Sequence, residues 1–130
     1  MDSRKRLNDV RILIVDDDND TREMLRFILE QAGAQVLPAG SVPDAMEMYK
    51  TSKPGVIVAD IGLPEYNGYA LMAQIREQDS KLGRKTPVIA LTAYTSPADE
   101  ETALAAGFRK YLAKPFEPAE IIEAIREVTI

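Results

Sequence analysis

Four apolar runs in this chain are each followed directly by polar side chains that can take part in chemistry. Asp16–Asp18 follow the first of these runs, Asp60 follows a later one, Thr92 follows the next, and Lys114 follows the last. Carboxylates, a hydroxyl and an ammonium group could together bind a charged ligand if folding brought them to one place. The elements that surround these residues therefore decide whether such a site exists.

Short, nearly continuous apolar runs alternate with amphipathic stretches, which is typical of strand-helix units around a parallel sheet that is buried on both faces. The expected strands are Ile12–Val15, Gln35–Leu37, Val56–Ala59, Val88–Leu91 and Lys110–Leu112. Right-handed crossovers then restrict the topology to an α/β, doubly wound, five-stranded sheet with helices on both faces, for which we take the common flavodoxin-like order 2-1-3-4-5. In this order Pro38 ends an edge strand. The carboxyl ends of the strands share one rim, where such sheets bind ligands.

The expected helices follow from apolar positions at helical spacing. Their apolar stripes are Met24, Leu25, Ile28, Leu29 and Ala32; Val42, Ala45, Met46 and Tyr49; Leu71, Met72 and Ile75; and Ile121, Ile122, Ile125 and Val128. Gly33 is a typical helix stop, and Ser41 with Asp44 resembles a capping box. A further helix over Pro97–Ala106 has only Leu104 as a large apolar residue, so we expect it to pack weakly. Asp79–Thr86 is expected to be a surface loop.

Composition narrows the classes of function. A chain of 130 residues with 45% hydrophobic residues fits a single domain. The net charge of −5, with both signs mixed along the chain, argues against direct nucleic-acid binding. Without cysteine or histidine, the chain offers no disulfide, thiolate metal site, or Ser-His or Cys-His pair. No signal peptide or membrane span is evident, so we expect a cytoplasmic protein with no membrane contact.

Each polar residue also has an ordinary structural explanation. Asp16–Asp20 could cap and complement a helix start, Asp60 and Thr92 could be a turn and a strand residue, and Lys114 could simply be solvated. Their conjunction at one rim favours a site. Within the acidic run we assign Asp16 and Asp17 to the site and Asp18 and Asp20 to the helix start.

Four sequence stretches resemble the response-regulator receiver family of two-component signalling. They are ILIVDDD at Ile12–Asp18, DIGLPEYNG at Asp60–Gly68, VIALTA at Val88–Ala93 and YLAKPF at Tyr111–Phe116. The resemblance runs from about Val10 to Val128, and we interpret residues 1–130 as a single receiver domain with a core at about 10–128. It implies a signalling phosphoacceptor that is not an enzyme.

The resemblance also implies roles for individual residues. Asp16, Asp17, Asp60 and the backbone carbonyl of Gly62 would bind Mg²⁺, or Mn²⁺ in its place, since hard oxygen ligands suit both ions. Asp60 would accept the phosphoryl group, and Thr92 and Lys114 would contact its oxygens. The Lys114-Pro115 bond would be cis. Because the chain has no histidine, the phosphohistidine must belong to a partner, either a sensor histidine kinase or a histidine phosphotransfer protein.

By the same resemblance, Thr92 and Tyr111 would act as a coupled switch. The output would be a rearranged surface of helix 4, strand 5 and helix 5, read by a target that the sequence does not name, with the chain a monomer or weak dimer. Gly62 and Tyr94 would set the lifetime of the phosphorylated state. Gly62 has no side chain to guide a water molecule and Tyr94 could cover the site, so we expect slow self-dephosphorylation.

Two other interpretations remain open. Asp16 and Asp18 form a D-x-D motif like that of a haloacid-dehalogenase-like phosphatase, although such enzymes need a further acidic pair after the lysine. Beyond Lys114 the acids are Glu117, Glu120, Glu123 and Glu127, all in a helical segment. A receiver-like binding module that is not phosphorylated is the second alternative.

Overall fold

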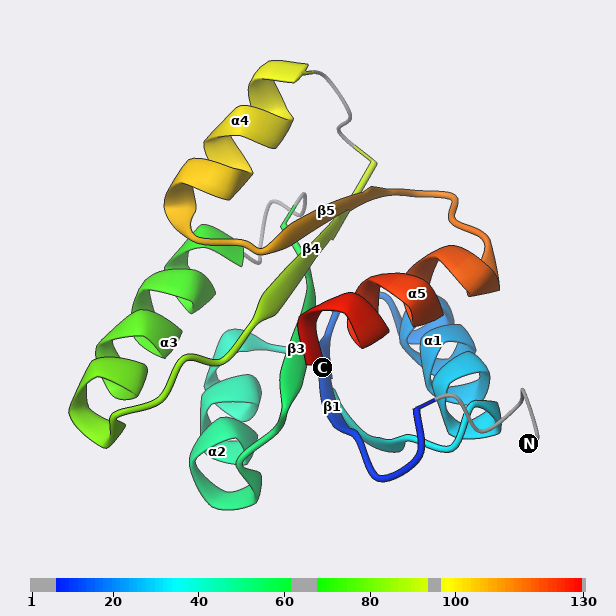
Figure 1. Cartoon of the computed structure of the whole chain (residues 1–130), viewed down its shortest axis with the longest axis horizontal. Helices are drawn as coiled ribbons and strands as arrows, with labels where there is room; N and C mark the ends of the chain where they lie inside the picture. Colours follow the sequence, from blue (N-terminus) through cyan, green and yellow to red (C-terminus); the bar gives the residue numbers. More distant parts are fainter. Residues whose placement is uncertain (1–6, 62–67, 94–96, 130) are drawn as a thin grey trace.

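The computed structural model describes residues 7–61, 68–93 and 97–129, and these form one parallel sheet with helices on both faces (Figure 1). The strands are β1 (Arg11–Val15), β2 (Gln35–Ala39), β3 (Val56–Asp60), β4 (Val88–Thr92) and β5 (Lys110–Ala113). The helices are α1 (Asn19–Gln31), α2 (Val42–Ser52), α3 (Gly68–Leu82), α4 (Pro97–Ala106) and α5 (Pro118–Thr129). The strand order β2-β1-β3-β4-β5 confirms the predicted flavodoxin-like fold.

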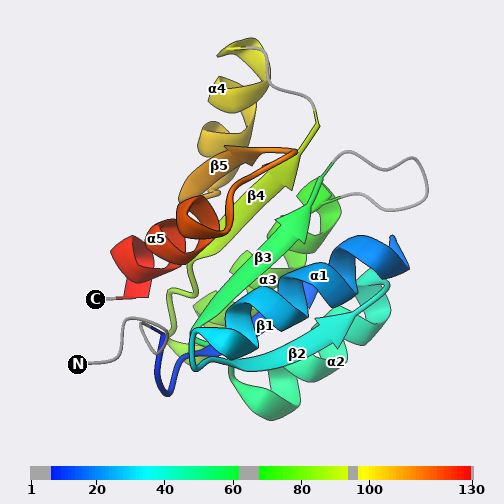
Figure 2. The same ribbon diagram turned by 90° about the vertical axis from the view of Figure 1, so that its right-hand side faces the viewer.

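The helices divide between the two faces of the sheet, with α1 and α5 on one face and α2, α3 and α4 on the other (Figure 2). Alternate residues of each central strand point to opposite faces. In β1, Ile12 and Ile14 pack toward α1 and α5, while Leu13 and Val15 pack toward α2 and α3. Every residue of β3 and β4 is buried, which explains why these strands appear in the sequence as unbroken apolar runs.

Local signals fix where several elements begin and end. Ser41 caps α2, because its hydroxyl accepts a hydrogen bond of 3.2 Å from the amide of Asp44. Asp18 caps α1 and accepts from the amide of Thr21 at 3.1 Å, as predicted for a helix-start acid. After α1, Gly33 has a φ of 99°, a conformation that glycine adopts without steric cost. Pro38 lies in the edge strand β2, as expected.

One sequence prediction of burial was wrong, and two further positions show burial for which no prediction was made. Met24 belongs to the predicted stripe of α1 but is 48% exposed, because the buried contacts of this helix are made by Leu25 and Leu29. Leu104 is exposed. The smaller Ala103 is the buried residue of α4 and packs into the hydrophobic core. Leu7 lies in the polar N-terminal stretch yet is fully buried. Its amide donates a hydrogen bond to the carbonyl of Ala32, which holds this segment next to the C-terminal end of α1.

The predicted surface loop Asp79–Thr86 was wrong at its start, because α3 continues to Leu82 and Asp79 is buried. The carboxylate of Asp79 accepts hydrogen bonds from the Tyr49 hydroxyl, the Thr86 amide at 2.7 Å and the Thr86 hydroxyl at 2.9 Å. A buried carboxylate is stable only with such partners. The three bonds join α2, α3 and the start of β4 at the amino-terminal end of the sheet.

The capping bond of Ser41 gives a direct test of how α2 begins. Ser41→Ala should lower the free energy of unfolding by about 1 kcal/mol, since the amide of Asp44 loses its acceptor. Urea unfolding measures this change. The exposed Ser80, within α3, is the control, and Ser80→Ala should change stability by less than about 0.5 kcal/mol. Equal effects of the two substitutions would contradict the capping role.

Candidate functional site

The predicted site residues lie at the carboxyl ends of four neighbouring strands. Asp16 directly follows β1, Asp60 ends β3, Thr92 ends β4 and Lys114 directly follows β5. Asp60 is aligned with Leu91, the residue before Thr92, and Thr92 is aligned with Ala113, the residue before Lys114. The sheet order and this register bring the four residues to one rim, as the sequence predicted.

The ammonium of Lys114 joins the two acidic strand ends. Its Nζ lies 2.6 Å from Oδ2 of Asp60 and 3.1 Å from Oδ2 of Asp16, both hydrogen-bonding distances. Asp16 and Asp60 are almost completely buried, with 1% and 4% exposure. The partly buried ammonium of Lys114 therefore places a positive charge beside two buried carboxylates, and hydrogen bonds between charged groups are of the stronger kind.

Backbone contacts hold Asp16 in place. Its amide donates to the carbonyl of Ala39 in the edge strand at 3.1 Å, and its Oδ1 accepts from the amide of Asp18 at 2.9 Å. Its carbonyl accepts from the guanidinium of Arg22 on α1 at 2.8 Å. The sequence interpretation missed Arg22, although its position one turn into the helix after the acidic run could have indicated it.

Burial and the neighbouring charges act in opposite directions on the pKa values of Asp16 and of Lys114. Loss of solvent raises the pKa of Asp16 above its ordinary value, and the Asp18 amide and the Lys114 charge only partly oppose this effect. Burial alone would lower the pKa of Lys114, but its hydrogen bond to Asp60 and the charge of Asp16 outweigh it and raise that pKa. Lys114 is therefore cationic at neutral pH.

Thr92 and Lys114 are linked through the backbone as well as through their place on the rim. The side chain of Thr92 is fully buried, and its carbonyl accepts a hydrogen bond of 2.8 Å from the amide of Lys114. The Lys114-Pro115 peptide bond is cis, as the sequence interpretation expected.

Of the expected metal ligands, the structure brings Asp16 and Asp60 together, while Asp17 is exposed. Among the residues the structure describes, no group of three acidic side chains lies close enough to hold a metal ion. The two buried carboxylates fit a divalent cation in their chemistry, since hard oxygens meet beside a half-buried rim. The role of Asp17 stays a prediction, and Gly62 lies outside the described residues.

Tyr111, the expected switch residue, lies on β5 and is partly buried against the cluster beneath α3 and α4. Its hydroxyl oxygen is buried and has no hydrogen-bond partner among the described residues. Burial and the negative charge of Asp99 on α4 raise the pKa of this phenol. A buried hydroxyl without a hydrogen-bond partner lowers the stability of the folded state, so this position of the Tyr111 side chain is unfavourable. Tyr94 lies outside the described residues.

The structure argues against the phosphatase interpretation. Asp18 would be the second acid of a D-x-D motif, but it caps α1 and accepts from the Thr21 amide. Three of the four acids after Lys114 are also engaged elsewhere: Glu120 accepts from the amide of Glu117, Glu123 pairs with Arg126, and Glu127 pairs with Lys110. In the part of the chain that is described, none of the helices combines the length and hydropathy needed to cross a membrane.

Comparison with known proteins defines the class of this fold and site. The family model of the response regulator receiver domain matches residues 12–126. An uncharacterised 14.6 kDa protein of Leptolyngbya boryana is 41% identical over 116 residues, which cover 89% of this chain and 87% of that protein. The chemotaxis protein CheY of Thermotoga maritima is 34% identical over 120 residues, which cover 92% of this chain and 97% of CheY.

Solved structures agree with this result. A putative response regulator from Chloroflexus aurantiacus has a TM-score of 0.84 at 32% identity, with 94% of this chain and 98% of that one covered.

The chain also matches longer proteins and spans about half of their length, for example 44% of a probable transcriptional regulator, ycf27, of Guillardia theta.

The chain belongs to the response-regulator receiver family of two-component signalling and is CheY-like in fold. Members of this family are typically signalling phosphoacceptors rather than enzymes, work with a histidine kinase and generally use Mg²⁺.

The charge of Asp16 gives the site a testable pH dependence. Its raised pKa means that the folded state binds a proton more readily than the unfolded state, so the free energy of unfolding falls as pH rises above 3.8, the ordinary carboxyl value. Asp16→Asn removes that charge. In EDTA the variant should be more stable than the wild type at neutral pH, and the difference should shrink as the pH is lowered toward the ordinary carboxyl value.

Urea unfolding across this pH range measures the effect. The amide of asparagine can still accept from Asp18, and Lys114 keeps Asp60 as its partner, so the substitution changes mainly the buried charge. A stability difference that is independent of pH would contradict the assignment.

Proposed function

We propose that this chain is a phosphorylation switch in which Asp60 accepts a phosphoryl group from a partner's phosphohistidine in an Mg²⁺-dependent reaction. The observation that supports this most strongly is the ion-paired cluster at the rim, where Lys114 contacts both Asp60 and Asp16. A half-buried cation next to a carboxylate at the open end of a parallel sheet suits phosphoryl transfer, which depends mainly on positioning and charge.

In the proposed reaction a carboxylate oxygen of Asp60 attacks the phosphorus of the donor. The new P–O bond forms as the P–N bond to the histidine breaks, and the electron pair of that bond leaves with the imidazole. Lys114 is already within hydrogen-bond distance of Asp60 and can stabilise the negative charge of the phosphoryl oxygens, with the hydroxyl of Thr92 as a second donor. The protein therefore contributes mainly electrostatic stabilisation.

Asp16, Asp17, Asp60 and the carbonyl of Gly62 would hold the magnesium ion. When bound, Mg²⁺ would reduce the repulsion between the carboxylates and the incoming phosphoryl group, a repulsion of about 1 to 4 kcal/mol for each charge pair at the edge of a protein. The burial of Asp16 and Asp60 side by side supports this role, and burial also raises the pKa of Asp16 above its ordinary value.

The switch would connect the rim to a surface formed by α4, β5 and α5. Thr92 would move toward the phosphoryl group and Tyr111 would follow it inward, a two-state equilibrium that phosphorylation shifts. Two observations support this proposal. The buried hydroxyl of Tyr111 has no hydrogen-bond partner among the described residues, and α4 buries only Ala103. Few contacts therefore hold this region in one arrangement.

The remaining parts of the proposal concern partners and lifetime. The donor would be a sensor histidine kinase or a histidine phosphotransfer protein in the cytoplasm, and the downstream target is unassigned. Gly62 and Tyr94 would make self-dephosphorylation slow. A receiver-like module that is never phosphorylated remains the competing function.

Incubation with acetyl phosphate and Mg²⁺, followed by intact mass spectrometry, tests the phosphoacceptor. The wild type should gain one phosphoryl adduct, and Asp60→Asn should gain none because its amide is a poor nucleophile. The exposed Asp44, in the first turn of α2, is the matched control, and Asp44→Asn should be phosphorylated normally. Lys114→Gln should slow the reaction by about 100-fold or more, the usual effect of losing one electrostatic donor.

The same experiment separates the alternatives. A wild type that gains no adduct from acetyl phosphate or from a phosphorylated kinase would favour the unphosphorylated binding module. Multiple turnover of a phosphate ester that survives Asp60→Asn and is lost in Asp16→Asn would favour the phosphatase.

The unpaired hydroxyl of Tyr111 gives a test of the switch. Tyr111→Phe should raise the free energy of unfolding of the unphosphorylated chain by about 1 kcal/mol, because a buried polar atom without a partner is removed. Urea unfolding measures this change. Tyr69→Phe is the control, since Tyr69 packs edge-on against Phe108 in the same cluster. A loss of stability in Tyr111→Phe would show that the hydroxyl is paired in solution.

A further inference from the structure

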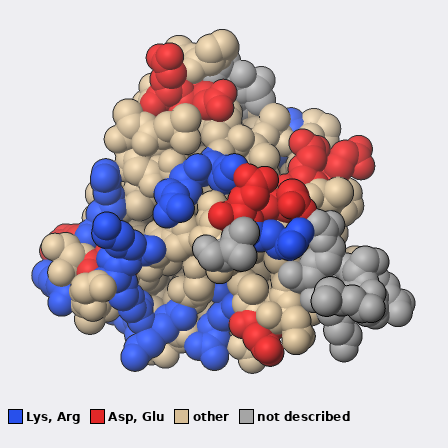
Figure 3. Space-filling model, viewed as in Figure 1, with Lys and Arg blue, Asp and Glu red and all other residues tan. Residues whose placement is uncertain are grey.

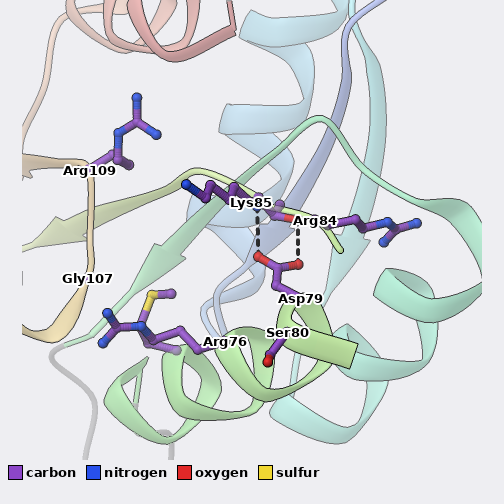
Figure 4. A pocket seen from close by; sticks show the side chains of 9 residues that line it. Arg76, Asp79, Ser80, Arg84, Lys85, Gly107 and Arg109 are labelled. Atoms are coloured by element: carbon purple, nitrogen blue, oxygen red, sulfur yellow. Dashed lines mark hydrogen bonds between the residues drawn. The ribbon is translucent and has the colours of Figure 1, made fainter. Parts of the chain in front are cut away.

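A second cleft lies at the opposite end of the sheet from the rim site. It has a volume of about 380 Å³ and lies between the C-terminal half of α3, the segment before β4 and the turn before β5 (Figure 4). Arg84 and Lys85 precede β4 and Arg109 precedes β5, whereas Asp60 and Lys114 lie at the carboxyl ends of their strands. Strands of five residues separate the two ends by about 15 Å at the usual rise of a strand.

The cleft is cationic. Arg76, Lys85 and Arg109 line it, and Figure 4 shows their side chains around a common space, while Arg84 points away. The guanidinium of Arg84 lies over the ring of Tyr49, with 5.3 Å from Cζ to the ring centroid, so it is engaged in a cation–π contact. Three cations therefore remain available to the cleft.

None of these three cations has a carboxylate partner within the described residues, unlike several Lys and Arg side chains elsewhere. The cations Arg26, Lys81, Lys110 and Arg126 pair with glutamates. Asp79 is the one acidic residue that lines the cleft, but its oxygens already accept from Tyr49 and Thr86. In a chain with a net charge of −5, this local excess of positive charge is unusual.

Arg76 is held ready for a ligand. Its Nη1 donates to the carbonyl of Ala106 at 2.7 Å, which fixes the guanidinium against the turn after α4. The guanidinium lies close to Gly107, since a Cβ at that position would lie 3.0 Å from Cζ of Arg76. The φ of Gly107 is +113°, a conformation that other residues rarely adopt. The side chain of Arg76, held by this hydrogen bond, lines the cleft.

The molecular surface shows the same separation of charge. On the face shown in Figure 3, Lys and Arg side chains gather over α3 and the segment before β4, and acidic side chains lie over α4 and α5. The cleft therefore opens within a basic part of an otherwise acidic molecule.

We infer that this cleft, lined by Arg76, Lys85 and Arg109, binds a small anion that carries a phosphate group. Guanidinium groups match the oxygens of phosphate in geometry and charge, and the hydroxyl of Ser80 lies at the same cleft. The volume lies near the lower end of the range of about 300 to 1,000 Å³ for small-molecule sites. Met72 is the one large apolar side chain in the lining, so the cleft suits a small charged ligand better than an apolar one.

Isothermal titration calorimetry of the whole chain in EDTA tests this inference with pyrophosphate, inorganic phosphate and ribose 5-phosphate as probes. At low salt at least one probe should bind saturably, and added salt should weaken binding. The probe that binds most tightly identifies whether the ligand is a free phosphate or a phosphate ester. The double variant Lys85→Gln/Arg109→Gln should bind at least about tenfold more weakly, because two charged donors are lost.

A matched double variant controls for the change in net charge. Lys50→Gln/Lys81→Gln removes two positive charges on α2 and α3 outside the cleft and should keep the wild-type affinity. Lys85 and Arg109 are exposed, so the test variant should remain folded, which circular dichroism can verify. Amide chemical shifts should move at Ser80, Thr86 and Gly107 rather than at the rim near Asp60.

Four results would overturn the inference, and the first three concern the phosphate probes. They are the absence of saturable binding of every phosphate probe at millimolar concentrations, equal weakening in the two double variants, and shifts confined to the rim. Binding of an acidic peptide without binding of any phosphate probe would also overturn it, in favour of a protein partner.

Discussion

Burial of two carboxylates beside one ammonium is the interaction on which the rest of this structure depends. Asp16 and Asp60 lie almost fully buried at the ends of neighbouring strands, and a buried negative charge is unstable unless a cation or hydrogen-bond donors compensate it. Lys114 reaches both from the end of β5. Because the pKa of Asp16 still lies above its ordinary value, this compensation is incomplete, and the rim is suited to accept further positive charge.

The fold satisfies this requirement through its topology. Three of the strands that carry the site, β1, β3 and β4, lie side by side in the centre of the sheet, with apolar side chains packed against helices on both faces. These contacts fix the strand ends. By contrast, α4 contributes Ala103 as its one buried residue, and β5 is only partly buried. The rigid part of the molecule thus holds the acids, and the loosely packed part lies beside Tyr111.

Sequence patterns predicted the five strands, the five helices and the residues at the rim, because continuous apolar runs, helix caps and strand-end polar residues are local signals. The strand order followed from the doubly wound class of the fold rather than from a local signal. The sequence patterns failed where the burial or pairing of a residue depends on how side chains pack in three dimensions. Met24 has the spacing of the apolar stripe of α1, but Leu25 and Leu29 of the same stripe make the buried contacts and Met24 is exposed. Asp79 looked like a loop residue, since nothing in its local sequence shows that Tyr49 would bond to it. The positions of Gly62 and Tyr94 stay predictions.

Pro38 has a consequence for how copies of this molecule could associate. An outer strand normally offers unpaired amides and carbonyls to which a strand of another chain can add, a common route to aggregation. In β2 the proline removes one donor from a strand of five residues, and the other outer strand, β5, has four residues. Neither border offers a long template, so extension of the sheet is a disfavoured route for self-association of this molecule.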